Sequence, residues 1–159
     1  MDKYRADFYG GPMQKVTHEA MRGPSAWSVG DRELMAALVA KANQSEFCMK
    51  AHAAVVQRAY GDAKNVSAFL SDPDSAALRE PLRATMLMLH KLAREHTLTR
   101  DDILSVLAAG ASSEQIEDAL AVSFSFNVIG RLADAFGFLV PAPEAFESGA
   151  KYLLSRGYR

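Results

Sequence analysis

The sequence predicts an all-α protein of six or more helices in a single domain spanning residues 1–159. Apolar residues recur every three to four positions, and no stretch alternates with the period of two that marks a half-buried strand. Capping motifs and helix-ending glycines divide the chain into segments of helical length. With 49% hydrophobic and 23% charged residues, the chain has the composition of a globular protein with a real core.

The individual helices follow from these local signals. We expect an irregular N-terminal arm over residues 1–27, with at most a short helix near Gln14–Met21, because Gly-Gly-Pro and Gly-Pro interrupt it. Capping residues at Ser28, Thr99 and Ser112 predict helix starts. Phe124 is predicted to face inward. The predicted helices run, in order, over 28–41, 46–60, 66–70, 81–96, 100–108, 113–136 (continuous or restarted at 127) and a C-terminal helix within 141–157.

Charge and composition argue against several functional classes. The net charge is -1, with acidic and basic residues interspersed, so no basic patch favours nucleic acid or a membrane surface. No apolar run approaches the length of a membrane span, and the polar start of the chain does not resemble a secretory signal. The single cysteine cannot form an intrachain disulfide, which favours the cytoplasm. Nothing in the sequence predicts a cofactor or a metal.

The stretch from Ser45 to His52 contains the only cysteine, Cys48. Cys48 and His52 are four residues apart and therefore lie on one helical face, one turn apart. Ser45 is a good N-cap, and we expect its side chain to accept a hydrogen bond from the backbone of Cys48. The sulfur would then lie in the first turn, where the helix dipole favours an anion. We therefore predict a lowered thiol pKa and a nucleophilic or redox cysteine.

Two segments of the chain resemble the AhpD-like alkylhydroperoxidases of the carboxymuconolactone decarboxylase superfamily. The first combines Glu33, fifteen residues before Cys48, with Ser45-Glu46-Phe47-Cys48 and His52. In that family a glutamate precedes a C-x-x-C at the start of the next helix, and a histidine follows the second cysteine by four. The second segment, 126–137, is similar to the F-N-x-x-x-R-x-A-D-A-x-G block of peroxidase-related members. The match spans residues 28–138 and implies an AhpD-like helical bundle.

The resemblance also implies roles for individual residues. Cys48 would be the reactive thiol, and His52 and Glu33 would form a proton relay that activates it. The chain departs from the family at Ser45, which replaces the first cysteine and cannot resolve a sulfenic acid as a disulfide. Ser45 could only cap the helix or hydrogen-bond the sulfur. The family further implies a homo-oligomer (a dimer, trimer or hexamer), a small-molecule substrate and an external thiol reductant.

Three functions stay open at this point. The first is an antioxidant enzyme that reduces hydrogen peroxide or an organic hydroperoxide through Cys48. The second is lactone decarboxylation or a related proton transfer, with Glu33 and His52 as acid and base. The third is a non-enzymatic oligomeric protein that has lost the redox pair. A lone cysteine is also often inert core, and Cys48, His52 and Glu33, with His90 or water, could instead be zinc ligands.

Overall fold

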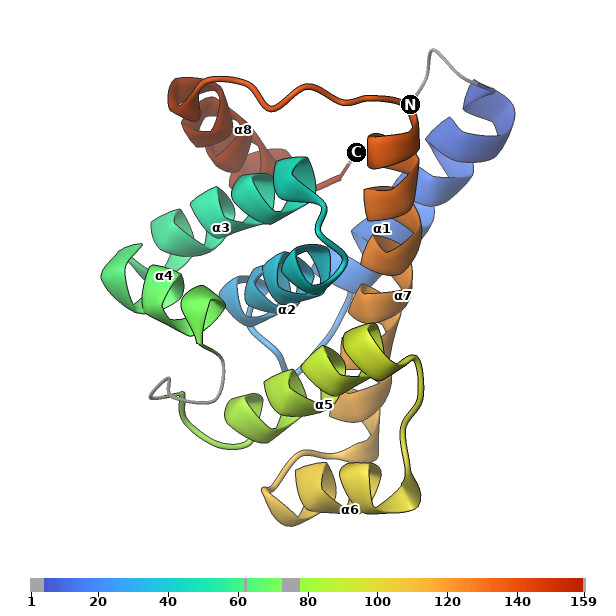
Figure 1. Ribbon diagram of the computed structural model, residues 1–159, viewed down its shortest axis with the longest axis vertical. Coiled ribbons are helices and arrows are strands. Elements are labelled where there is room, and N and C mark those ends of the chain that lie inside the picture. The colour runs from blue at the N-terminus through green and yellow to red at the C-terminus, as the bar shows by residue number, and fades with distance from the viewer. Residues whose placement is uncertain (1–4, 62, 73–77, 159) are drawn as a thin grey trace.

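The computed structural model describes residues 5–61, 63–72 and 78–158, which form a bundle of α-helices with no strand among them (Figure 1). The all-α prediction is confirmed. The elements are, in order, the π-helix η1 (Ala6–Gly10), α1 (Gly11–Arg22), α2 (Val29–Ala42), α3 (Glu46–Tyr60), α4 (Ala63–Ser71), α5 (Leu82–Glu95), α6 (Arg100–Ala108), α7 (Ser113–Ala135) and α8 (Pro143–Arg156).

Helix α2 is the centre of the bundle. It contacts α1, α3, α4, α5 and α7, and every residue from Gly30 to Ala40 is buried. Its sequence is apolar on nearly all sides, as expected of a helix surrounded by others. Asp31, Arg32 and Glu33 are the exceptions, so this helix carries three charged side chains into the interior. Glu33 is the most deeply buried of them, with 0% of its surface exposed.

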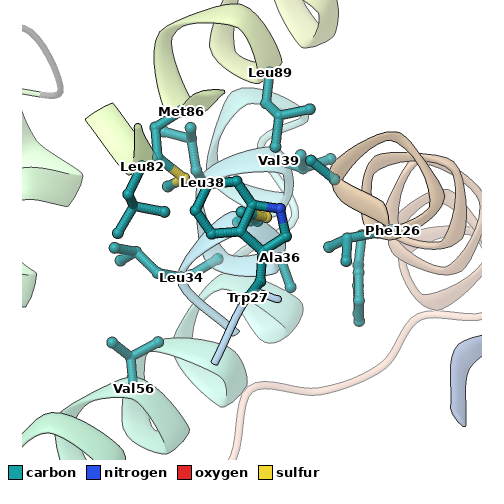
Figure 2. Close-up of a cluster of buried hydrophobic side chains, with 14 of the residues drawn as sticks. Trp27, Leu34, Ala36, Leu38, Val39, Val56, Leu82, Met86, Leu89 and Phe126 are labelled. Carbon is teal, nitrogen blue, oxygen red and sulfur yellow. The ribbon is translucent and has the colours of Figure 1, made fainter. Parts of the chain in front are cut away.

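The hydrophobic core packs around α2 (Figure 2). Each large side chain buried there stabilises the fold by about 1.5–3 kcal/mol. Trp27, in the segment that leads into α2, also donates a hydrogen bond from its ring nitrogen to the carbonyl of Gln115 at 2.8 Å. This bond ties the start of α2 to α7. The labelled side chains come from α2, α3, α5, α7 and the Trp27 segment: Trp27, Leu34, Ala36, Leu38, Val39, Val56, Leu82, Met86, Leu89 and Phe126.

The capping motifs predicted from the sequence are present. Ser28, Thr99 and Ser112 each accept a hydrogen bond from the backbone three residues later, and the residue there closes a capping box. Helix α3 spans Glu46–Tyr60, the range predicted for it, and ends at Gly61 in the left-handed conformation. Helix α7 is one continuous helix of 23 residues.

The N-terminal arm is more helical than predicted. Residues 1–4 lie outside the described part, but η1 and α1 occupy nearly all of residues 6–22. The irregular arm predicted over 1–27 is therefore wrong for these residues. Pro12, which suggested a turn, lies in the first turn of α1, where its missing N–H has no intrahelical partner to lose. Helix α1 buries Thr17 and Met21 and packs against α2 and α7.

Phe124 was also predicted to face inward, and it is 59% exposed. On α7 the buried positions include Ile116, Ala119 and Phe126, and Phe124 lies off that face. The periodicity of this helix is weak because serines occupy two of its buried positions, Ser123 and Ser125.

Ser28→Ala should lower the free energy of unfolding by about 1 kcal/mol, because the backbone N–H of Asp31 loses its acceptor at the start of α2. Urea titration measures this loss. Ser148→Ala on α8 is the matched control, since the Ser148 hydroxyl is exposed and bonds only the Glu144 carbonyl of its own helix. It should stay within about 0.5 kcal/mol of the parent protein. Equal losses in both variants would contradict a capping role for Ser28.

Candidate active site

Glu33 of α2 and His52 of α3 meet inside the bundle. The two helices pack side by side, and Glu33 Oε2 lies 2.6 Å from His52 Nδ1. The two side chains are 0% and 6% exposed. The structure therefore brings together the glutamate and the histidine that the sequence singled out as a relay.

Arg22 and Tyr158 complete this cluster, and sequence reasoning missed both. Arg22, at the end of α1, donates from Nη2 to Glu33 Oε1 at 2.6 Å and to the Leu153 carbonyl at 3.0 Å. The Tyr158 hydroxyl donates to the Glu33 carboxylate at 3.0–3.1 Å and lies 3.3 Å from His52 Nδ1. The Arg22 guanidinium also lies 5.1 Å from the centre of the Tyr158 ring. Tyr158 is 125 residues from Glu33 in sequence, so no local spacing could signal the contact.

Tyr158 is held in place by α1. Its backbone N–H donates to His18 Nδ1 at 3.3 Å. The preceding residue, Gly157, has a φ of +67°, and a Cβ added there would lie 2.9 Å from the His18 ring. Only glycine fits this close approach in that conformation. The end of the described chain is thus fastened to α1, beside the Glu33 cluster.

The charges of the cluster fix its proton positions. Burial raises the pKa of Glu33, but the hydrogen bond and charge of His52 and the charge of Arg22 outweigh this and hold the pKa below its usual value. Ionised Glu33 can only accept, so the proton in the Glu33–His52 hydrogen bond belongs to Nδ1. A neutral His52 then has its lone pair on Nε2. Burial, and next the charge of Glu33, raise the pKa of Tyr158 well above its usual value, which keeps it a donor.

Cys48 lies one turn before His52 on α3, and both line the same cavity. The predicted lowering of the thiol pKa is wrong. Burial raises the pKa of Cys48, and the charge of Asp134 adds to this, whereas the nearby Ser45 hydroxyl acts in the opposite direction. Because the side chain is only 4% exposed, the loss of water outweighs the helix dipole. Cys48 is therefore a neutral thiol in the resting protein.

Ser45 is the N-cap of α3, as predicted, but it does not make the predicted hydrogen bond. Its side chain does not cap the helix; the hydroxyl donates to Asp134 Oδ1 at 3.1 Å. A hydroxyl has only one proton to donate. While Ser45 donates this proton to Asp134, it cannot also donate it fully to the Cys48 sulfur. Ser45 is fully buried and connects the start of α3 to α7.

The segment 126–137, which covers the last part of α7 and the turn after it, packs against the start of α3. Asn43 donates to the Asn127 side chain at 2.9 Å. A Cβ added at Gly130 would lie 3.3 Å from the Ser45 Cβ, so glycine allows this close approach. Phe126 contacts the His52 ring edge to face, with 4.3 Å between ring centres. The two sequence segments that carried the family resemblance are therefore neighbours in space. Residues of the second segment pack against the start of α3 and the His52 ring and so help to position them.

A cavity of about 490 Å³ opens beside Cys48 and His52. It lies among η1, α1, α3, α7 and α8, and most of its wall is apolar. Side chains of every one of the four α-helices contribute to that wall, among them Met13, Phe47, Ile129, Phe146 and Leu153. A small molecule in this cavity would meet the thiol and the imidazole together.

The structure also bears on the zinc interpretation of Cys48, His52, Glu33 and His90. Among the described residues, no group of three or more His, Cys, Asp or Glu side chains could hold a metal ion, so this interpretation finds no support. No helix in the described ranges is long and apolar enough to cross a membrane. The homo-oligomer and the cytoplasmic location stay predictions.

No family model matches the chain, and no curated protein matches it. Solved structures do match. One is an uncharacterized peroxidase-related protein from Ralstonia eutropha JMP134, described as an alkylhydroperoxidase AhpD core. Its TM-score is 0.83 at 19% identity, over 94% of this chain and 78% of that one.

A second match is an uncharacterized peroxidase-related protein from Silicibacter sp. TM1040. Its TM-score is 0.78 at 23% identity, over 86% of this chain and 71% of that one. At such identities the likeness establishes the architecture and leaves the chemistry to the residues of the site. The chain therefore has the AhpD-like all-α fold that its sequence predicted.

Proposed function

We propose that this protein is a thiol-dependent peroxidase that reduces hydroperoxides with Cys48. The observation that carries the proposal is the shared cavity wall: Cys48 and His52 line the same cavity, while Glu33 engages the other nitrogen of the imidazole. A nucleophile, a base one helical turn away and a group that orients the base match the usual components for activating a thiol. The fold likeness to peroxidase-related proteins supports the same class.

The neutral thiol requires its base during the reaction. When a hydroperoxide enters the cavity, His52 Nε2 takes the proton of Cys48, and the sulfur attacks the distal peroxide oxygen. The O–O bond breaks, the sulfur is oxidised to sulfenic acid, and the peroxide is reduced to an alkoxide. The proton on His52 passes to that alkoxide, which leaves as an alcohol. The step consumes one thiol and one hydroperoxide and leaves the imidazole unchanged.

Glu33 acts through His52 and is a positioning residue. Its carboxylate holds the Nδ1 proton and stabilises the imidazolium that forms when Nε2 is protonated. Arg22 in turn helps to keep the pKa of Glu33 low, and Arg22 and Tyr158 hold its carboxylate in place. These three groups orient the base without touching the sulfur.

The sulfenic acid must be reduced from outside the chain. Ser45 stands where a partner cysteine would resolve it, and its hydroxyl is bonded to Asp134. An external thiol would condense with the sulfenic acid and release water, and a second thiol would then reduce the mixed disulfide. Repeated turnover is therefore expected only with a thiol reductant present, and without one each protein reduces a single hydroperoxide.

With cumene hydroperoxide and dithiothreitol, Cys48→Ser should reduce turnover to the uncatalysed background, because the nucleophile is gone. His52→Ala should lower kcat/KM by about 100-fold or more, the usual effect of losing a general base. The control is His90→Ala on α5, a histidine outside the cavity. Peroxide turnover that persists in Cys48→Ser would contradict the proposal, as would failure of dimedone to trap a sulfenic acid on Cys48.

One observation favours a second function, proton transfer at a lactone or related substrate. The Glu33–His52 cluster is complete without sulfur, and burial raises the pKa of the Cys48 thiol. His52 would then abstract a proton next to the substrate carbonyl. With this function, Cys48→Ser keeps the activity and His52→Ala loses it. The peroxidase, by contrast, should lose its activity in Cys48→Ser.

The Glu33 cluster should also be a large contributor to stability. Glu33→Gln should lower the free energy of unfolding at neutral pH by about 3–5 kcal/mol, because Arg22 would retain a largely buried charge without its partner. Tyr158→Phe removes one donor and leaves no unpaired charge, so it should cost only about 1 kcal/mol. Urea titration of both variants and the parent protein measures the difference.

The pH dependence follows from the lowered pKa of Glu33. A carboxyl with a lower pKa in the folded state contributes stability that is complete above its unfolded pKa and is lost as the pH falls through the folded pKa. The gap between parent and Glu33→Gln should therefore shrink below pH 4.5, the usual value for this group, because protonated Glu33 is uncharged like Gln. If the difference in unfolding free energy between the parent protein and Glu33→Gln is the same above and below pH 4.5, Glu33 is not ionised in the folded protein.

A further inference from the structure

We propose that the cavity beside Cys48 and His52 binds neutral, apolar small molecules and rejects carboxylates, so that the hydroperoxide reduced here carries no charge. The inference rests on the proposed function only for naming the ligand a hydroperoxide. The binding preference itself follows from the size, charge and depth of the cavity.

The cavity has the dimensions of a small-molecule site. Its volume of about 490 Å³ falls within the roughly 300–1,000 Å³ typical of such sites. Thr17, Cys48 and His52 are buried at its inner wall, whereas Gln14 and Tyr152 are exposed at its rim. A ligand that presents its reactive oxygen to Cys48 must therefore place the rest of its body along the apolar wall.

A carboxylate in the cavity would find no charged side chain to pair with. Among the described residues, no Lys, Arg, Asp or Glu lines the cavity. Arg22, the buried cation behind His52, is already bonded to Glu33 and to the Leu153 carbonyl. The exposed charged residues of α8 do not line the cavity either: Glu144, Glu147, Lys151 and Arg156.

A carboxylate that entered would lose its water without gaining a counter-ion, which is strongly unfavourable. A neutral hydroperoxide or alcohol needs only one hydrogen-bond acceptor for its O–H. His52 Nε2 offers that acceptor, since Nδ1 is engaged with Glu33. Hydrogen peroxide would satisfy the same acceptor but would leave the apolar wall uncovered. An uncharged organic body therefore fits the cavity best.

The test compares 1-octanol with octanoate, which share a chain and differ in charge. Each is titrated for its ability to slow the alkylation of Cys48 by iodoacetamide at about pH 8, where octanoate is ionised. We expect 1-octanol to protect Cys48 and octanoate to bind at least about tenfold more weakly. The rise in Tm with each ligand gives the same comparison without using the thiol.

Two variants locate the binding. Gly149 lines the cavity, and a Cβ added there meets nothing within 4 Å, so Gly149→Leu should fill part of the space without a clash and weaken 1-octanol by about tenfold or more. Ser148→Leu, at the preceding residue on α8 and outside the lining, is the matched control. Gln14→Lys places a cation at the exposed rim of the cavity. It should strengthen the binding of octanoate relative to 1-octanol, so that the two affinities become more similar.

Each outcome bears on the inference. Equal binding of octanoate and 1-octanol would overturn the charge preference. No protection and no Tm shift from 1-octanol, or an equal effect of Gly149→Leu and Ser148→Leu, would overturn the site. If 1-octanol binds as expected but no hydroperoxide is turned over, the proposed peroxidase function fails and the binding site stands. If hydrogen peroxide alone is reduced and 1-octanol does not bind, the peroxidase stands and this inference fails.

Discussion

Glu33 carries a negative charge into the buried interior of the bundle, and donors from three parts of the chain compensate this charge. Arg22 comes from the end of α1, His52 from α3, and Tyr158 from the segment after α8. A buried carboxylate is tolerated only when its oxygens are satisfied in this way. One side chain on the central helix thus joins the end of α1, helix α3 and the segment after α8. The same carboxylate accepts from Nδ1 of His52, which leaves the lone pair of a neutral imidazole on Nε2.

The chemistry of the site divides between two groups with opposite surroundings. Glu33 is ionised because partners outweigh its burial, whereas Cys48 stays a neutral thiol because burial outweighs its partners. In the proposed reaction, His52 would therefore take the Cys48 proton only when a substrate is present. Ser45 belongs to neither group, since its hydroxyl joins α3 to α7 through Asp134. Its side chain is a structural contact between the two helices.

The fold could be predicted where it depends on neighbours in sequence. Helix α3 begins and ends where Ser45 and Gly61 indicate, because caps act within a few residues. The common face of Cys48 and His52 follows from helical spacing alone. Arg22 and Tyr158 could not be found in this way, because they reach Glu33 only through tertiary packing. The prediction of a lowered thiol pKa failed for a related reason. The dipole of the first turn is a local effect, whereas the burial of Cys48 depends on tertiary neighbours such as Ala40 of α2 and Ala133 of α7.

Glu33 forces one tautomer on His52, with the proton on Nδ1 and the lone pair on Nε2. Nitrogen NMR of isotope-labelled histidine measures this tautomer directly at a pH of about 8.5 or above, where an ordinary imidazole is neutral. Comparison with a His52→Ala sample assigns the signals of the two ring nitrogens. We expect a protonated Nδ1 and an unprotonated Nε2. A proton on Nε2 would contradict this tautomer, because Nε2 could then neither accept the proton of Cys48 nor receive the hydroxyl of a bound ligand.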